Sequence, residues 1–197
     1  KPAFIVNQVC GSGIRSIASG FQSIKSGDSK IVIAGGQENM SLAPHAVHLR
    51  EGKKLGDTEM TDTMIKDGLW DAFHGYHMGI TAENVATKFQ VTRDQQDKFA
   101  FSSQQKALKA QKENKFKNEI VNFKIKSKKS EVNFNQDEHP RDGINLEALK
   151  RLKPVFKKDG TVTAGNASGI NDGAAAVTLM TEEEAEKRSL SKLVTIK

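Results

Sequence analysis

The feature that most constrains the fold of this chain is a strand–helix–strand pattern near its beginning, with a cysteine at the first junction. An apolar run predicts a strand over residues 4–9, apolar side chains at helical spacing predict a helix over 11–26, and a second apolar run predicts a strand over 31–34. Such a β-α-β unit is typical of a parallel sheet with helices on its faces. The near-continuous apolar runs also predict strands that are covered on both faces. We therefore expect an α/β fold.

Cys10 lies between the predicted first strand and the predicted helix, and Gly11-Ser12-Gly13 follows it. We expect N–H groups at the start of the helix to point at the sulfur, and the helix dipole favours a negative charge there. The thiolate is the reactive form of cysteine. The two glycines predict a tight turn with room for a substrate carbonyl. Cys10 is thus a candidate nucleophile, and the alternative is a buried thiol that only fills the core.

The composition excludes several classes of protein. The 197 residues suffice for one domain or two small ones. A single cysteine excludes a disulfide framework and favours a reducing compartment, so we expect a cytoplasmic protein. No stretch has the length of a membrane span and no signal peptide is recognisable, which predicts no membrane partner. Because the chain opens almost directly into a strand, we expect that an upstream part is missing.

The net charge of +6 makes nucleic acid a partner to consider. The basic residues are spread along the chain, except for a cluster within residues 124–129, and no aromatic platform is interleaved with its later lysines. We therefore expect no nucleic-acid partner. A modest positive field suits a phosphorylated small molecule equally well.

Residues 41–168 form a long and more irregular stretch between two parts of the predicted sheet. Such insertions on a sheet scaffold usually carry binding function. The expected elements after residue 40 are helices over 81–89, 92–114, 145–151 and 182–188, and strands within 120–135, over 174–180 and over 194–196. Capping-box patterns, Thr92 with Gln95 and Thr181 with Glu184, mark the starts of two of these helices. The strand expected over 174–180 is rich in alanine, whose side chain is short. We therefore predict a buried strand with another element packed close to it.

Four motifs occur in a fixed order along the chain. They are V-N-Q-V-C-G-S-G at 6–13, A-G-G-Q-E-N-M-S at 34–41, G-Y-H-M-G-I-T-A-E-N at 75–84 and T-A-G-N-A-S-G-I-N-D-G-A-A-A at 163–176. Together they resemble the thiolase family, and within it the short-chain acetyl-CoA acetyltransferases. The resemblance covers essentially the whole chain.

The resemblance implies a layered α-β-α architecture that is only partly present. Residues 1–40 and 169–190 correspond to the first and last parts of an N-terminal thiolase domain. Residues 41–168 correspond to an inserted α+β loop subdomain that binds coenzyme A, and residues 191–197 to the start of a missing C-terminal domain.

The resemblance also assigns a role to each matching residue. Cys10 corresponds to the nucleophile that carries the acyl group as a thioester, and its N–H group contributes to an oxyanion hole. His77 and Met78 correspond to residues that line the pantetheine and acyl pocket, and the Ser168 hydroxyl to a group that contacts pantetheine. The remaining positions around coenzyme A are Leu69, Arg141 near the nucleotide end, Phe156, Ala164 and Gly169.

Simpler interpretations of these residues stay open on the sequence alone. His77 could be a core histidine with satisfied hydrogen bonds, and Met78 could only fill the core. Arg141 could be a surface partner in a salt bridge. An arginine nevertheless suits the planar base or the phosphates of a nucleotide.

A metal site deserves consideration because four histidines occur in two His-x-x-His spacings, at 45 and 48 and at 74 and 77. No second cysteine is available and no carboxylates stand beside the pairs, so we expect no metal. By the same resemblance, Phe73 stands where some thiolases have a tyrosine that serves a potassium site, so we expect no potassium ion there. No cofactor is expected, because coenzyme A thioesters are substrates.

The activity that the resemblance implies is acyl transfer to and from coenzyme A. Cys10 attacks an acetyl-CoA, and a second acetyl-CoA, deprotonated at its methyl carbon, attacks the resulting thioester to give acetoacetyl-CoA. Thiolysis is the reverse reaction. Homodimers or homotetramers are implied as the assembly.

Thiolases carry further catalytic groups in a C-terminal half: an activating histidine, a second cysteine and an asparagine that holds a water molecule. This chain contains none of them and therefore resembles a central fragment. The missing groups leave open a catalytically incomplete fragment that binds coenzyme A or supports oligomerisation. A longer-chain 3-ketoacyl-CoA thiolase is a second alternative, which the depth of the pocket around Met78 and Leu69 would decide.

Overall fold

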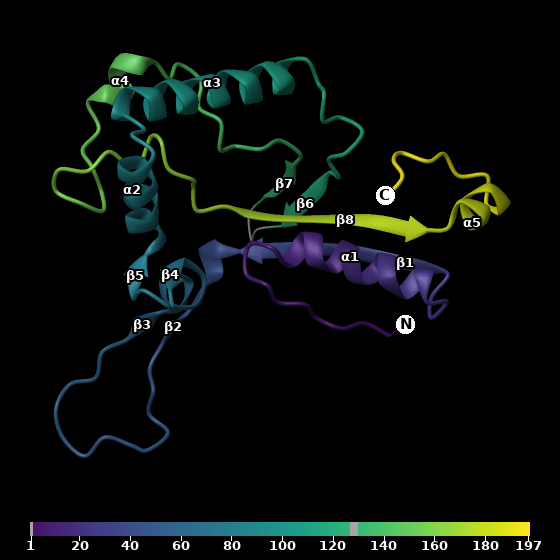
Figure 1. Ribbon diagram of the computed structural model, residues 1–197, viewed down its shortest axis with the longest axis horizontal. Coiled ribbons are helices and arrows are strands. Elements are labelled where there is room, and N and C mark those ends of the chain that lie inside the picture. The colour runs from purple at the N-terminus through teal and green to yellow at the C-terminus, as the bar shows by residue number, and fades with distance from the viewer. Residues whose placement is uncertain (1, 127–129) are drawn as a thin grey trace. The chain divides into compact units, whose positions relative to one another are not determined.

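The computed structural model describes residues 2–126 and 130–197 (Figure 1). By its internal contacts the chain divides into two compact units. One contains Lys1–Gly68 and Ile170–Lys197, and the other contains Leu69–Gly169. Helices and strands occur in both, as the α/β class requires. The expected thiolase domain boundaries after residues 40, 168 and 190 stay a prediction.

The first unit contains a two-stranded antiparallel sheet covered on one face by a helix. Strand β1 (Ile31–Asn39) pairs with β8 (Asp172–Met180) along their whole lengths, and α1 (Ser12–Lys25) lies along β1 (Figure 1). Gly20 of α1 is buried, and a methyl group added there would lie 2.9 Å from Leu179 and 3.0 Å from Val32. The missing side chain lets the helix rest directly on the two strands.

The strand predicted over residues 4–9 is wrong. Residues 2–7 have no regular structure, and Ile5 is 97% exposed. A strand needs a neighbouring strand for its backbone hydrogen bonds, and the described residues supply none for this segment. The β-α-β unit with parallel pairing is therefore not formed, and β1 pairs antiparallel with β8 instead. The strand predicted over 194–196 is absent for the same reason.

The expectation that both faces of these strands are covered is also wrong. Ala34 is the buried residue of β1, whereas Ile33 is 76% exposed. Successive side chains of a strand point to opposite faces, and α1 covers the face of Val32 and Ala34. Strand β8 is present as predicted but exposed over most of its length. Its close neighbour is β1 itself, since a methyl group on Gly35 would overlap the Ala175 carbonyl oxygen.

The remaining elements of the first unit are short. They are the 3-10 helix η1 (Met40–Leu42), strands β2 (His45–Ala46) and β3 (Thr61–Asp62), which pair antiparallel, the π-helix η2 (Met64–Leu69), whose last residue belongs to the second unit, and α5 (Glu182–Lys187). The Thr181 hydroxyl accepts a hydrogen bond from the Glu184 N–H and caps α5. The predicted capping box is only half formed, because the Glu184 side chain pairs with Arg188 instead.

The second unit is built on two consecutive helices, α2 (Met78–Lys88) and α3 (Arg93–Lys112). The predicted capping box at the start of α3 is confirmed, because Thr92 and Gln95 exchange hydrogen bonds. The other elements are strands β4 (Trp70–Asp71) and β5 (Tyr76–His77), which pair antiparallel, the antiparallel hairpin of β6 (Phe123–Lys126) and β7 (Glu131–Phe134), and helix α4 (Leu146–Lys150). The strands expected within 120–135 are thus confirmed, except for residues 127–129, which lie outside the described residues.

The interior of the second unit contains both apolar and charged side chains. Ala86, Leu108, Leu149 and Val162 are buried, and so are Glu83, Asp97 and Thr163. Buried carboxylates are uncommon and need hydrogen-bond partners. Apart from Arg93 on α3, the partners of Glu83 and Asp97 lie within residues 161–166, where the fourth sequence motif begins.

Candidate active site

Cys10 lies at the tip of a tight turn that leads into α1, and its side chain is exposed. The turn is closed by the Ser12 hydroxyl, which accepts a hydrogen bond from the Gln8 N–H at 2.8 Å and donates one to the Val9 carbonyl at 2.7 Å. The Asn7 side chain accepts a further bond from the Val9 N–H at 3.0 Å. The exposed position of Cys10 contradicts the alternative of a buried filler.

The backbone immediately before the cysteine is strained. Val9 has a φ of 49°, in the left-handed region that β-branched residues rarely adopt. Such strain persists only where surrounding contacts hold it, and it occurs often at functional sites. Here the contacts are the hydrogen bonds of Asn7 and Ser12, which place Cys10 at the tip of the turn.

The N–H groups next to the cysteine are already bonded within the turn. The Gly11 N–H donates to the Gln8 carbonyl at 2.9 Å, and the Ser12 N–H donates to the Val9 carbonyl at 3.1 Å. The expectation that N–H groups at the helix start point at the sulfur is therefore wrong for these two. Gly11 is close to its surroundings, since a methyl group there would lie 3.3 Å from the Gln8 carbonyl oxygen, whereas Gly13 has open space around it.

His77 and Phe156 meet in the second unit. Their rings stack with centroids 4.7 Å apart and an angle of 25° between the planes. His77 is also the N-cap of α2, because its Nδ1 accepts a hydrogen bond from the Gly79 N–H at 2.9 Å. An Nδ1 that accepts leaves the proton of a neutral imidazole on Nε2, so Nε2–H is the donor that a ligand could meet.

Met78 and Leu69 lie near this pair of rings. Met78 is the first residue of α2, directly after His77, and is partly exposed. Leu69 directly precedes Trp70, which pairs with His77 in the β4–β5 hairpin. Leu69 therefore enters the hairpin at the end that carries His77.

Ala164, Ser168 and Gly169 lie on one loop of the same unit. The loop is anchored at Thr163, which is fully buried and forms a bridge with Pro154. Ala164 and Ser168 are exposed and Gly169 is half-buried, so these small residues present backbone and a hydroxyl at the surface. The segment from Pro154 to Thr163 contains Phe156, which connects this loop to the His77 ring.

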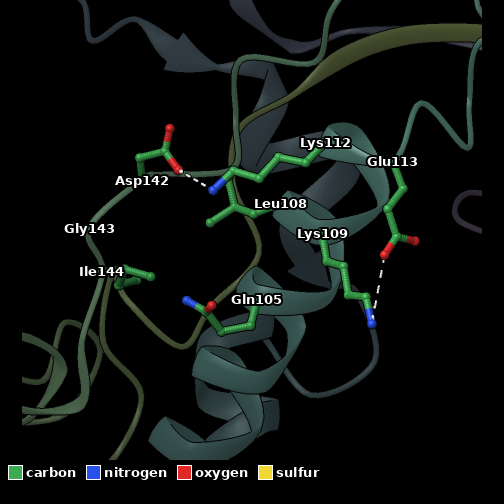
Figure 2. A pocket seen from close by; sticks show the side chains of 8 residues that line it. All are labelled: Gln105, Leu108, Lys109, Lys112, Glu113, Asp142, Gly143 and Ile144. Carbon is green, nitrogen blue, oxygen red and sulfur yellow. Dashed lines mark ion pairs between the residues drawn. The ribbon is translucent and has the colours of Figure 1, made fainter.

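Arg141 is exposed, and its backbone N–H donates a hydrogen bond to the Gln104 side-chain oxygen at 3.1 Å. Beside it, a hollow of about 420 Å³ lies between α3 and residues 142–144 (Figure 2). The hollow has two lysines in its wall, but Lys112 faces Asp142 at 3.8 Å and Lys109 faces Glu113 at 3.8 Å. Its charges are therefore largely compensated.

The predicted site residues thus fall into two groups. His77, Met78, Phe156 and the loop with Ser168 belong to the second unit, whereas Cys10 belongs to the first. Among the described residues, no three His, Cys, Asp or Glu side chains gather closely enough to hold a metal ion. No helix in the described part of the chain has the length and apolar character to cross a membrane.

A family model described as the N-terminal domain of thiolase matches residues 1–183. The chain belongs to the thiolase family. An acetyl-CoA acetyltransferase of Rhizobium meliloti is 59% identical over 196 residues, which are 100% of this chain and 50% of the relative. The cytosolic acetyl-CoA acetyltransferase of Rattus norvegicus is 54% identical over 197 residues, which cover 99% of this chain and 50% of the relative.

The crystal structure of human mitochondrial 3-ketoacyl-CoA thiolase matches the fold with a TM-score of 0.91 and 42% sequence identity, covering 96% of this chain and 48% of that one. The thiolase architecture inferred from the motifs is therefore confirmed. This thiolase chain spans about half the length of the relatives that it matches.

Sequence reasoning missed the buried polar residues that hold the loop of this thiolase chain. Glu83 and Asn166 both stand inside quoted motifs, at 75–84 and 163–176, but no role was assigned to them. Asp97 follows Arg93 by four residues on α3, a spacing that predicts an ion pair. The sequence does not show that this pair is buried.

Proposed function

We propose that this thiolase chain accepts an acetyl group from acetyl-CoA on Cys10, as one step of the condensation of two acetyl-CoA to acetoacetyl-CoA or of the reverse thiolysis. The observation that carries the proposal is the exposed Cys10 at the tip of a strained turn before α1. The names and high identity of the acetyl-CoA acetyltransferase relatives support it.

In the proposed first step the Cys10 thiolate attacks the carbonyl carbon of acetyl-CoA. The new C–S bond forms, the old one breaks, and the coenzyme A thiolate leaves and takes up a proton. In the second step a base removes a proton from the methyl group of another acetyl-CoA, and the carbanion displaces the Cys10 thiolate to give acetoacetyl-CoA. The acid and base groups of that second step would come from the half that the relatives have in addition.

The second unit is proposed to bind coenzyme A. The narrow pantetheine arm of coenzyme A would lie against His77, Met78 and Phe156. The small residues of the loop that contains Ser168 would let the loop backbone approach this arm. The His77 Nε2–H and the Ser168 hydroxyl are suitable donors to the amide oxygens of this arm. Leu69 and Ala164 would contribute apolar contact, Gly169 close approach, and Arg141 a planar cation for the nucleotide.

The experiment that tests the activity is an intact mass measurement after incubation with acetyl-CoA. We expect one acetyl group on the protein, located on Cys10 by peptide mapping, and none on Cys10→Ala. If the protein binds coenzyme A but forms no covalent adduct, the result would instead support the alternative of a catalytically incomplete fragment that only binds coenzyme A. Repeating the incubation with a longer acyl-CoA tests the alternative of a longer-chain thiolase.

Assembly and location are proposals of the same kind. We expect a homodimer or homotetramer, which the native mass would reveal. A cytoplasmic location is supported by the single cysteine and by the cytosolic relative from rat. No resident cofactor or metal is proposed, because coenzyme A thioesters enter and leave as substrates.

A further inference from the structure

Two carboxylates of the second unit are almost completely removed from solvent, and the proposed chemistry uses neither. Glu83 on α2 is 5% exposed, and Asp97 on α3 is 1% exposed. A buried carboxylate is costly unless several donors surround it. The donors that surround these two come mainly from residues 161–166.

Glu83 binds the beginning of this segment through four contacts. Its carboxylate accepts the Thr161 N–H at 2.7 and 3.0 Å, the Thr161 hydroxyl at 3.0 Å and the Val162 N–H at 2.7 Å. Gly160 leaves room for the carboxylate, because a methyl group there would overlap it. Glu83 therefore fixes the backbone of residues 160–162 to the middle of α2.

Asp97 binds the same segment through Asn166. The Asp97 carboxylate accepts a hydrogen bond from the Asn166 side-chain amide at 3.0 Å, and its other oxygen pairs with Arg93 at 2.8 Å. The Asn166 amide also donates to the Thr161 carbonyl at 3.1 Å and accepts the Thr163 N–H at 2.7 Å. Asn166 thus closes residues 161–166 into a ring of hydrogen bonds, and Asp97 holds this ring to α3.

Glu83 connects the loop to the helix that His77 begins, and Asp97 connects the same loop to α3. Helix α2 carries Glu83 in its middle and has His77 as its N-cap, and the His77 ring stacks on Phe156 in the same segment that leads to the loop. A shift of residues 161–166 relative to α2 would therefore move Ser168 relative to His77. Both residues lie within one compact unit.

We propose that Glu83 and Asp97 are positioning residues that set the spacing between the His77 end of α2 and the Ser168 loop, and thereby the affinity for coenzyme A. The inference rests on the proposed function of this loop. Neither carboxylate is proposed to touch the substrate. Their removal affects binding of coenzyme A more than the chemical step at Cys10.

The test compares wild-type protein with Glu83→Gln and Thr161→Val. Both variants weaken the hydrogen bonding between α2 and the loop. Thr161→Val removes the hydroxyl bond to Glu83, and with it the bond accepted from the Gln96 side chain of α3, with little change in volume. Calorimetric titration with coenzyme A gives the Kd. The rate of Cys10 acetylation, measured at increasing acetyl-CoA concentration, gives two separate quantities: the acetyl-CoA concentration at half the maximal rate, and the maximal rate itself. Circular dichroism and the Tm identify variants that fail to fold.

We expect about a tenfold weaker affinity for coenzyme A and a saturating acetylation rate within about twofold of wild type in both variants. Thr161→Ser keeps the hydroxyl and should restore the affinity. Asp94→Asn, an exposed change on α3, serves as the matched control and should bind as wild type. If Glu83→Gln does not fold, Thr161→Val and Thr161→Ser decide the question.

Wild-type affinity in folded Thr161→Val, or a loss that appears only in the saturating rate, would overturn the inference. A wild-type protein that binds coenzyme A but never acetylates Cys10 would contradict the proposed activity alone, since the affinities of the variants could still differ as expected. A wild-type protein that does not bind coenzyme A would overturn both.

Discussion

The ring of Phe156 packs directly on the backbone of Gly79, in the first turn of α2. This contact and the stacking of Phe156 on His77 hold the segment after Pro154 against the start of the helix. Glycine at position 79 is required by the close approach, because a methyl group there would overlap the ring.

Gly79→Ala is therefore expected to destabilise the protein, by about 1–3 kcal/mol, since the Phe156 ring has to move out of its position. Chemical denaturation measures the change. The double variant Gly79→Ala with Phe156→Leu should recover part of the loss, because the smaller side chain makes room. Gly36→Ala serves as a control, since its methyl group would have open space. Equal stability of Gly79→Ala and wild type would show that the packing is looser than described.

Ser12→Ala should slow the acetylation of Cys10. The Ser12 hydroxyl holds both the Gln8 N–H and the Val9 carbonyl, and its loss lets the strained turn relax. A loss of about tenfold in rate is expected from the misplaced sulfur. The measurement is the time course of the acetyl adduct by intact mass.

Ser16→Ala is the matched control for that experiment. Ser16 lies one turn further along α1, and its hydroxyl donates only to the Gly13 carbonyl, at 2.7 Å. Ser12→Thr keeps the hydroxyl and should retain most of the rate. An unchanged time course in Ser12→Ala would mean that the turn does not depend on this hydroxyl.

Arg93→Met should cost about 3–5 kcal/mol of stability, because it leaves the buried Asp97 carboxylate without its charged partner. The same change removes the bonds from Arg93 to the carbonyls of Leu149 and Leu152, at 2.7 and 3.0 Å. Thermal unfolding gives the Tm. Lys98→Met breaks an exposed ion pair with Asp94 on the same helix and should change the Tm little. Similar Tm values for both variants would argue against the buried pair.

The stability of the second unit should depend on pH through Glu83. Burial by itself raises the pKa of Glu83, but the hydrogen bonds from Val162 and Thr161 outweigh it, and the pKa lies below its ordinary value of 4.5. A carboxylate whose pKa is lower in the folded state stabilises the protein above its unfolded pKa, and this contribution is lost as the pH falls through the folded value.

Denaturation curves should therefore show a free energy of unfolding that falls from about pH 5 downward. The fall should be smaller in Glu83→Gln, which has no carboxylate to protonate at this position. Glu183→Gln, an exposed change on α5, should follow the wild-type curve. Parallel pH curves for wild type and Glu83→Gln would contradict this assignment.

Local patterns in the sequence predicted the parts of the fold whose hydrogen bonds close within a few residues. The Thr92–Gln95 capping box, the cap at Thr181 and the start of α1 just after Cys10 are examples. Each depends on side chains one turn away, so the order of residues is sufficient to predict it. The motifs predicted family membership for the same reason, because they are contiguous.

The sequence predicted incorrectly where the outcome depends on a partner far along the chain. The apolar run over 4–9 has the composition of a strand, but Ile5 is exposed because the described residues offer no strand to pair with it. The antiparallel pairing of Ile31 with Met180 joins segments that are far apart in sequence. Strand formation is decided by such pairing.

The sequence by itself determined which segments form the longer helices, the thiolase motifs and the place of Cys10 just ahead of a helix, because these follow from neighbouring residues. It placed the start of α2 three residues too late, at Thr81 instead of Met78. Only the tertiary structure decided that β1 pairs with β8, that Phe156 stacks on His77, and that Glu83 and Asp97 are buried against the loop of Ser168. Burial and long-range hydrogen bonds bring together residues that are far apart along the chain, and no local sequence pattern predicts that they meet. These contacts are therefore determined only when the chain packs.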